Sequence, residues 1–231
     1  MRIEALSVFL PAYNEEKNIG QTVNKTINVL KKIAQKWEVL VINDGSKDQT
    51  AAIVEKISRK EPRVRLINHP QNRGYGGALK TGFSNSSYPW VAFTDADGQF
   101  DFAEIEKFLP KTTSADLILG YRLKRADATS RKLYTFGWKF VARLLLGLKV
   151  RDYSCGFKLI KKSVFEAVSP LETEEKVTQI EFLVKAHKKG FRFAEVGVHH
   201  FPRRFGAQTG ADLKVVVKSI LDLFDLWKKL N

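Results

Sequence analysis

The sequence contains a single cysteine, Cys155, among its 231 residues. An internal disulfide is therefore excluded, and this cysteine usage fits a reducing compartment. No neighbour of Cys155 in the sequence has the character of an activating base, so we do not expect a catalytic thiol. We predict no signal peptide, because the first apolar stretch is short and ends at Pro11. No apolar run approaches the roughly 18–20 residues of a membrane span, so we expect a soluble or peripheral protein.

Acidic residues are scarce relative to basic ones. The chain has 39 Lys and Arg against 25 Asp and Glu, which gives a formal net charge of +14 and a pI near 9.8. Such a surface favours polyanions, which include nucleic acid, anionic lipid headgroups and phosphorylated substrates. Lysines that only confer solubility explain part of this imbalance. The length allows one large domain or two small ones, and no repeat, low-complexity tract or domain linker interrupts it.

The first half of the chain alternates strand and helix patterns with short connections. This rhythm predicts a mostly parallel sheet with helices on both faces. Apolar runs predict strands at residues 6–10, 39–42, 64–67, 90–94 and 117–120. Helical spacing of apolar residues predicts helices at 15–36, 47–60, 77–84 and 101–109.

The second half has a different texture, beginning with a polar, basic connector at 122–131. Residues 133–148 form a basic amphipathic pattern with aromatics, which fits a helix on a membrane surface or one packed on the sheet. The spacing further predicts a helix at 176–189 and a strand at 191–198. The amphipathic pattern at 212–229 predicts a last helix that docks on the same chain.

Two aspartates, one residue apart, directly follow the apolar stretch at 90–94. Such stretches are typical of buried parallel strands, and ligands gather beyond the carboxyl ends of these strands. The carboxylates of Asp95 and Asp97 and the amide oxygen of Gln99 suit Mg²⁺ or Mn²⁺ and not a soft metal. Substrate phosphates commonly complete such a site, which suggests a nucleoside-diphosphate ligand. Solvated turn acids are the alternative, since this pattern is also good turn chemistry.

Polar segments also follow two other predicted strands, at the same edge of the sheet. Residues 11–16 follow the first strand and residues 43–48 follow the second. Within the latter, Asp44 can accept from a ring N–H group of uracil or guanine. The glycine-rich stretch 72–78 opens a helix N-terminus, where anions bind. A glycine-rich loop alone is a weak signal, but here four such segments occur in order at one sheet edge.

Together these segments resemble the inverting GT-A-fold glycosyltransferases of family 2, in particular the polyprenyl-phosphate branch typified by dolichol-phosphate mannose synthase. The resemblance covers nearly the whole chain, and its seven motifs in order are highly specific. They lie at residues 11–16, 43–46, 72–78, 95–99, 120–122, 152–158 and 200–210. Some members carry C-terminal transmembrane helices, and no apolar run here has that length. The expected attachment is therefore the helix at 133–148.

The resemblance implies a donor site in which Asp44 reads the base and Asp97 is the principal metal ligand, joined by Asp95 and Gln99. It makes Arg203, beside His200, the late arginine that closes over the donor diphosphate, although Arg204 also fits that role. The nucleotide-sugar contacts that it implies are Pro11, Ala12, Tyr13, Glu15, Asp44, Gly74, Ala78, Asp95, Ala96, Asp97 and Arg203.

On the acceptor side the resemblance implies that Arg122, Arg131 and Ser154 bind a lipid phosphate. Guanidinium forks match phosphate oxygens well. Asp152 occupies the position of the family's catalytic base. However, a phosphate monoester has a second pKa of about 6 and needs little deprotonation, so Asp152 either acts as that base or orients the acceptor or an arginine. Glu181 matches a recurrent acid, for which a structural role is expected.

The expected protein is thus a single α/β domain with the GT-A (Rossmann-like) fold: a mostly parallel sheet flanked by helices, with basic amphipathic helices in the C-terminal half. Residues 1–120 would form the nucleotide-sugar half and 121–231 the acceptor half. The expected reaction is inverting, Mg²⁺- or Mn²⁺-dependent transfer of a hexose from GDP-mannose or UDP-glucose to a polyprenyl phosphate. UDP-N-acetylglucosamine is a less favoured donor. We expect Asp97, Asp152 and Arg203 to be the catalytic residues.

We expect a cytoplasmic protein, peripherally attached to the anionic inner or plasma membrane, with no nucleic-acid partner; the sequence leaves its oligomeric state open. One alternative is the same fold acting on a non-lipid glycan acceptor. Another is a non-catalytic polyanion-binding protein, against which the intact Asp95, Asp97 and Gln99 set argues.

Overall fold

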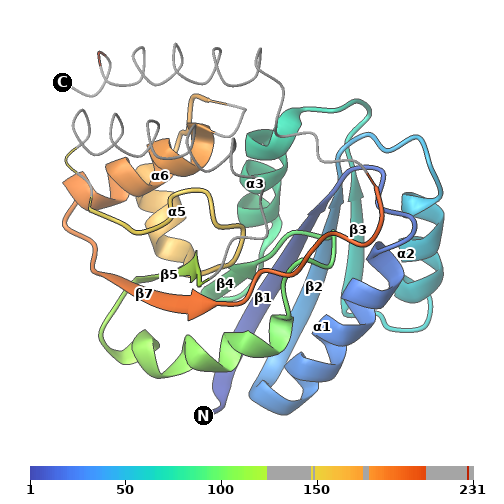
Figure 1. Cartoon of the computed structure of the whole chain (residues 1–231), viewed down its shortest axis with the longest axis horizontal. Helices are drawn as coiled ribbons and strands as arrows, with labels where there is room; N and C mark the ends of the chain where they lie inside the picture. The colour runs from blue at the N-terminus through green and yellow to red at the C-terminus, as the bar shows by residue number, and fades with distance from the viewer. Residues whose placement is uncertain (124–146, 148, 174–176, 207–227, 229–231) are drawn as a thin grey trace.

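A computed structural model describes residues 1–123, 147, 149–173, 177–206 and 228 of the chain (Figure 1). The predicted amphipathic helices at 133–148 and 212–229 fall almost entirely outside the described residues, as does Arg131. No helix in the described part of the chain is both long enough and apolar enough to cross a membrane.

One seven-stranded sheet forms the centre of the molecule, in the order β3-β2-β1-β4-β6-β5-β7. All neighbouring pairs are parallel except those of β6, which runs antiparallel to β4 and β5. The expectation of a mostly parallel sheet is therefore confirmed. The strands are β1 (Ile3–Ala12), β2 (Ala34–Asn43), β3 (Val64–Asn68), β4 (Trp90–Phe93), β5 (Leu117–Arg122), β6 (Lys158–Lys161) and β7 (Phe193–Val198).

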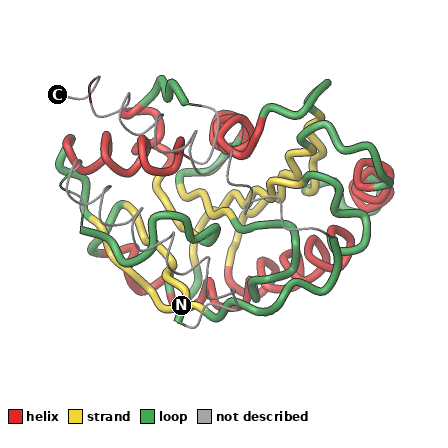
Figure 2. The backbone as a smooth tube through the Cα atoms, turned by 45° about the horizontal axis from the view of Figure 1, so that its top comes forward, coloured by secondary structure: helices red, strands yellow, loops and turns green. Residues whose placement is uncertain are grey.

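Helices cover both faces of this sheet, as the two views show (Figures 1 and 2). On one face lie α1 (Ile19–Ile33), α2 (Thr50–Ser58) and the 3₁₀ helices η1 (Phe102–Lys107) and η2 (Leu109–Thr113). On the other face lie α3 (Gly74–Asn85), α5 (Lys162–Val168) and α6 (Val177–Lys188).

The alternation of side chains along the strands explains why there are two cores. In β1, Val8 faces the core beneath α1, whereas its neighbour Phe9 faces the core beneath α3. Phe9 stacks on Phe93 of β4, with ring centroids 5.1 Å apart, and Phe83 of α3 meets both rings edge-on. Successive strand residues point to opposite faces, so a run that is apolar at every position is buried on both.

The elements differ from the sequence expectations in several places. β1 continues through Pro11 to Ala12, because β4 pairs with β1 only as far as Phe9 and the missing N–H of the proline therefore costs no ladder bond there. The helix expected at 101–109 is instead two short 3₁₀ segments, η1 and η2. Pro110 lies at the start of the second and cannot donate the bond that a continuous α-helix would need. β6 and α5 were not predicted.

Candidate active site

The candidate site lies where the sheet changes its winding direction. From β1 the chain moves outward through β2 and β3, then returns to place β4 on the other side of β1. In open α/β sheets, ligands bind in the crevice beyond the carboxyl ends of the strands at such a switch point. The end of β1 with the loop that follows it carries residues 11–16, and the turn after β4 carries residues 95–99, both of which the sequence singled out.

The loops after β1 and β2 are tied together by side-chain hydrogen bonds. Asn14, which adopts a φ of 55°, accepts from the Lys47 amide at 2.9 Å, and its own amide donates to Ser46 Oγ at 2.9 Å. The amide of Glu15 donates to Thr50 Oγ1 at 2.8 Å. The predicted donor residues Ala12 and Glu15 are buried, whereas Tyr13 is exposed. These bonds hold the two predicted nucleotide-binding loops as one rim.

Asp44 is the buried carboxylate of this rim. Its Oδ1 accepts from the amide of Arg73 at 2.8 Å and lies 2.7 Å from His69 Nδ1. The glycine-rich loop can come this close because of Gly45, where a Cβ atom would lie 2.6 Å from the amide nitrogen of Asn72. Gly45 also has a φ of +71°, which glycine tolerates best. The structure brings Asp44 and the glycine-rich loop together, as the sequence led us to expect. His69 was not among the predicted site residues.

The glycine-rich loop leads directly into α3. Gly74 begins that helix with a φ of +78°, and Ala78 is buried one turn later. The N-terminal amides of a helix favour an anion in front of them. Within this first turn, the phenol of Tyr75 donates to Asp95 Oδ1 at 3.0 Å, which links the loop to the aspartates after β4. Tyr75 lies within the glycine-rich stretch 72–78 but was not predicted to be a site residue.

Asp95 and Asp97 lie in the turn after β4, with Ala96 buried between them. The amide of Gln99 donates to Asp97 Oδ1 at 3.0 Å, which shapes the turn. Burial, and next the charge of Asp95, raise the pKa of Asp97 to about 7. The two carboxylates therefore repel each other, and a bound cation would relieve that repulsion.

The side chains at this turn fit a magnesium or manganese ion that substrate phosphates would complete better than a metal held by protein ligands alone. Among the described residues, no three side chains of His, Cys, Asp or Glu converge to hold a metal. Mg²⁺ is commonly bound by one or two carboxylates with substrate phosphates in the remaining positions. Asp95 and Asp97 supply such a pair. The side-chain nitrogen Nε2 of Gln99 donates to the Phe201 carbonyl at 2.9 Å, so its Oε1 atom is the one that could contribute to such a site.

The chain after β7 crosses the edge of the sheet and reaches the donor side (Figure 1). The amide of Phe201 donates to the Gln99 carbonyl at 2.8 Å. Beyond it, the guanidinium of Arg203 pairs with Glu15 and lies 3.4 Å from Asp97 Oδ2. Arg204 is exposed. Of the two candidate arginines, Arg203 therefore faces the aspartates.

On the predicted acceptor side, Arg122 and Asp152 form a bidentate ion pair. Arg122 Nε and Nη2 donate to the two carboxylate oxygens at 2.7 and 2.9 Å, and Nη2 also donates to Ser154 Oγ at 3.0 Å. The side chains of Arg122 and Asp152 are 9% and 4% exposed, so this pair is shielded from solvent. The structure thus brings together three of the predicted acceptor-side residues, while Arg131 lies outside the described part.

Gly156 connects the acceptor-side loop to the donor aspartates. A Cβ atom on Gly156 would lie only 2.3 Å from Asp95 Oδ2 and 2.6 Å from its Oδ1. Only glycine allows the backbone of the 152–156 segment to lie this close to the carboxylate. The loop that carries Asp152 and Ser154 is therefore in direct contact with a predicted metal ligand.

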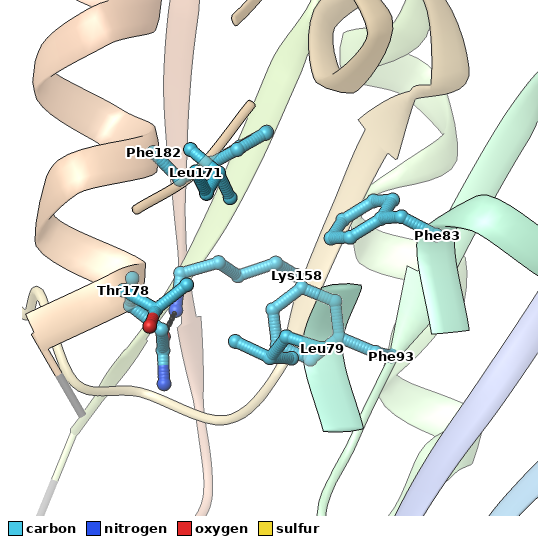
Figure 3. A pocket seen from close by; sticks show the side chains of 8 residues that line it. Leu79, Phe83, Phe93, Lys158, Leu171, Thr178 and Phe182 are labelled. Atoms are coloured by element: carbon cyan, nitrogen blue, oxygen red, sulfur yellow. Dashed lines mark hydrogen bonds between the residues drawn. The ribbon is translucent and has the colours of Figure 1, made fainter. Parts of the chain in front are cut away.

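A buried lysine lies beneath that loop. The ammonium of Lys158 donates to the Cys155 carbonyl and to the Gln179 side chain, and to the Tyr153 carbonyl at 3.4 Å. Figure 3 shows its stem crossing a small pocket toward α6. That pocket is lined by Leu79, Phe83, Phe93, Lys158, Leu171, Thr178, Gln179 and Phe182. Burial lowers the pKa of Lys158 to about 8.

The surroundings of two other buried side chains, Cys155 and Glu181, indicate structural roles. Burial raises the pKa of the Cys155 thiol to about 11, so the thiol stays protonated at neutral pH and is a poor nucleophile. The carboxylate of Glu181, which is fully buried, accepts from the amides of Glu172 and Thr173 at 2.8 and 2.9 Å and pairs with Lys185. Glu181 therefore anchors the segment before α6.

Comparison with known proteins decides the family. The sequence pattern described as "Glycosyl transferase family 2" matches residues 7–169, which is more than half of the chain. The chain belongs to glycosyl transferase family 2. This match covers both the donor rim and the 152–158 segment, so the resemblance inferred from the seven motifs is confirmed.

Relatives within the family are named for transfer to lipid phosphates. A dolichyl-phosphate beta-glucosyltransferase of Trichomonas vaginalis is 30% identical over 96% of this chain and 72% of its own length. The human dolichyl-phosphate beta-glucosyltransferase is 31% identical over 84% of this chain and 66% of its own. An undecaprenyl-phosphate 4-deoxy-4-formamido-L-arabinose transferase of Salmonella choleraesuis is 29% identical over 88% and 62%. The chain thus spans about two thirds of the length of these relatives.

Solved structures confirm the GT-A-like fold. Glucosyl-3-phosphoglycerate synthase of Mycobacterium tuberculosis in complex with UDP has a TM-score of 0.76 over 97% of this chain and 80% of its own, at 17% identity. The same enzyme with Mn²⁺, UDP-glucose and phosphoglyceric acid also has a TM-score of 0.76, with the same coverage and identity. At this identity the likeness concerns the fold alone.

Proposed function

We propose that this family 2 protein transfers glucose from UDP-glucose to a polyprenyl phosphate of the dolichyl type. The observation that carries the proposal is the close approach of Gly156 to Asp95, because it joins the loop of Asp152 and Ser154, which hold Arg122, to the aspartates predicted to bind the metal. A phosphate held at Arg122 would lie beside a sugar held at those aspartates. The names of the relatives support a lipid phosphate as acceptor and glucose, rather than mannose, as the sugar.

The reaction would be a direct displacement with inversion at the anomeric carbon. An oxygen of the acceptor phosphate forms the new bond to that carbon, while the bond to the UDP oxygen breaks and UDP leaves with the electron pair. Since the acceptor's second pKa is about 6, it is mostly a dianion at neutral pH and needs little help to lose a proton. We therefore assign Asp152 to orienting Arg122, whose two donors it fixes, rather than to removing a proton.

On the donor side, Asp44 would accept from the base, and Arg203 would neutralise the diphosphate as it leaves. A divalent metal bound by Asp95, Asp97 and Gln99 would stabilise the charge that develops on the leaving UDP. Arg203 already lies against Asp97 and Glu15, so the diphosphate would draw it from carboxylates to phosphates. We further propose peripheral attachment to the cytoplasmic face of an anionic membrane, which the net charge of +14 favours.

A donor screen tests this proposal. The protein is incubated with UDP-glucose, GDP-mannose or UDP-N-acetylglucosamine, with polyprenyl phosphate in liposomes, and nucleoside-diphosphate release is measured with and without Mn²⁺. We expect release from UDP-glucose that requires both the lipid and the metal. Release with a soluble phosphate or glycan in place of the lipid would instead establish a non-lipid acceptor. No release from any donor by a folded protein would leave a non-catalytic polyanion binder.

Two matched carboxylate variants test the metal site within this assay. Asp97→Asn removes a predicted ligand charge and should lower turnover by at least about 10²-fold, as the loss of a transition-state interaction does. Asp101→Asn is the control, because Asp101 is exposed and only caps η1 through the Ala103 amide. Full activity of Asp97→Asn, or of the wild type after chelation, would refute metal binding at this turn.

A further inference from the structure

His69 lies directly after β3 and is buried against the base-reading carboxylate. Its backbone amide donates to the Asn43 carbonyl at 2.9 Å, which extends the pairing of β2 and β3. Its ring is held at both nitrogens: Nδ1 lies 2.7 Å from Asp44 Oδ1, and Nε2 lies 2.9 Å from Thr81 Oγ1 on α3. The side chains of His69 and Asp44 are 5% and 6% exposed, so water does not compete for these bonds.

The hydrogen-bonding directions follow from the chemistry of the partners. An ionised carboxylate only accepts, so the His69 Nδ1 atom must carry the hydrogen that points at Asp44. The amide of Arg73 donates to the same oxygen at 2.8 Å. A carboxylate oxygen has two lone-pair sites, and these two donors occupy both on Oδ1.

The other carboxylate oxygen of Asp44, Oδ2, has different hydrogen bonding. Asp44 Oδ2 accepts no hydrogen bond from the residues that the structure describes. Oδ2 is not fully enclosed, although the side chain as a whole is only 6% exposed. Asp44 therefore offers one acceptor atom to a nucleobase and withholds the other.

This single acceptor discriminates between bases. Uracil has one ring N–H group, at N3, between two carbonyls, and one oxygen suffices for it. Guanine has two adjacent donors, N1–H and the N2 amino group, which match a carboxylate that offers both oxygens. With Oδ1 already occupied, one guanine donor would be desolvated without a partner, and such buried groups are costly.

We propose that His69 sets the base specificity of the donor site, selecting uracil over guanine by occupying Oδ1 of Asp44. The inference rests on the proposed function only in taking Asp44 as the base reader. His69 is a positioning residue in this account, because it acts through Asp44 and not on the reacting atoms. Thr81 fixes the ring from the opposite side and keeps Nδ1 directed at the carboxylate.

A comparison of GDP with IDP isolates the effect. IDP keeps the N1–H donor of GDP and lacks only the N2 amino group. The affinity of the wild type for UDP is measured by calorimetry in the presence of Mn²⁺, and the purine nucleotides are measured in competition with UDP. We expect UDP to bind tightest, and IDP to bind about 5- to 100-fold more tightly than GDP, the cost of one unsatisfied buried donor.

Three variants then identify His69 as the cause. His69→Leu frees Oδ1 from one donor and should shift the GDP-to-IDP affinity ratio toward GDP by about 5- to 100-fold. His69→Asn retains an N–H group near the Nδ1 position and should retain the preference for IDP. Thr81→Val removes only the outer bond of the histidine and should also retain it. A general loosening of the rim would weaken all nucleotides alike and would not change this ratio.

Two results would overturn the proposal. One is a wild type that binds GDP as tightly as IDP or more tightly. The other is a folded His69→Leu protein that still prefers IDP, or still excludes GDP, as the wild type does. If His69→Leu fails to fold, the wild-type comparison and the His69→Asn variant decide. A protein that shows these nucleotide preferences and yet transfers no sugar would refute the proposed function while leaving this inference intact.

Discussion

Replacing Gly156 by alanine should disable the site through one added methyl group. The new Cβ atom would lie 2.3 Å from Asp95 Oδ2, whereas ordinary contacts begin at 3.4 Å. The carboxylate or the 152–156 segment must therefore move by about 1 Å, the difference between these two values. Gly156 does not adopt a positive φ, so alanine suffers no backbone strain there and the contact alone causes the effect.

The size of the effect follows from what that movement breaks. Asp95 accepts from Tyr75 at 3.0 Å, and losing a hydrogen bond to a charged group costs about 1.5–3 kcal/mol. Forcing a methyl group into a packed site costs about 1–3 kcal/mol. We therefore expect the free energy of unfolding to fall by about 2.5–6 kcal/mol, the two costs taken together. A reacting group misplaced by about 1 Å can lose about 10²-fold in rate, and we expect a fall in kcat of that order.

The control is a clash of similar size against a core side chain instead of a site carboxylate. In Gly82→Ala the new Cβ atom would lie 2.4 Å from a ring carbon of Phe9, in the core beneath α3. This variant should lose about 1–3 kcal/mol of stability and keep its activity per folded molecule. Denaturant unfolding gives the stabilities, and UDP release at saturating donor and lipid gives kcat.

Two outcomes would refute the reasoning. If Gly156→Ala has the same kcat as the wild type per folded molecule, the contact with Asp95 does not position the site. If both variants lose activity alike, the loss comes from general destabilisation of the sheet and not from the displaced carboxylate.

Three further predictions concern Lys158, Arg122 and Tyr75. The pKa of Lys158, about 8, lies below the ordinary 10.5, so between these pH values the unfolded chain binds more protons than the folded one. The free energy of unfolding of the wild type, relative to that of Lys158→Met, should therefore rise by about 3 kcal/mol across this pH window in denaturant titrations. Arg122→Ala removes the bidentate ion pair of the buried Asp152, to which Ser154 Oγ still donates at 3.3 Å, and should lower the free energy of unfolding by about 3 kcal/mol in the same titrations, with Arg122→Lys less damaging. Tyr75→Phe removes the donor to Asp95 and should weaken Mn²⁺ about 10- to 100-fold in metal-dependent UDP binding.

Most strands and helices of the first half could be predicted because their pattern is local; the exceptions are residues 34–36, which belong to β2 and not to the expected helix, and the 3₁₀ segments at 102–113. Continuous apolar runs predicted the parallel strands, since a strand buried on both faces has no polar side. β6 was missed because its four residues begin and end with lysine, which is atypical of a buried strand. Lys158 is nevertheless fully buried, because two carbonyls and the Gln179 side chain, all brought by the folded chain, accept from its ammonium.

The candidate site shows the same division between local and distant information. Spacing alone placed Asp95, Asp97 and Asp44 at strand ends, because parallel strands share one edge. The partners of these carboxylates come from elsewhere in the chain. His69 is 25 residues from Asp44 and Arg203 is 106 residues from Asp97. No periodicity connects residues so far apart, so sequence reasoning could not choose between Arg203 and Arg204.

The contacts that sequence reasoning missed are those that join the two halves of the site. Asp95 accepts from Tyr75 of α3 on one side and meets Gly156 of the predicted acceptor-side loop on the other. Asp97 is approached from the far end of the chain by Arg203. In the proposed direct displacement, the attacking oxygen, the anomeric carbon and the leaving oxygen would have to lie in line, so positional errors in the two halves would add. A carboxylate wedged between both halves gives them a common reference point. For this reason Gly156, which carries no functional group, should be as sensitive to substitution as the aspartate that it contacts.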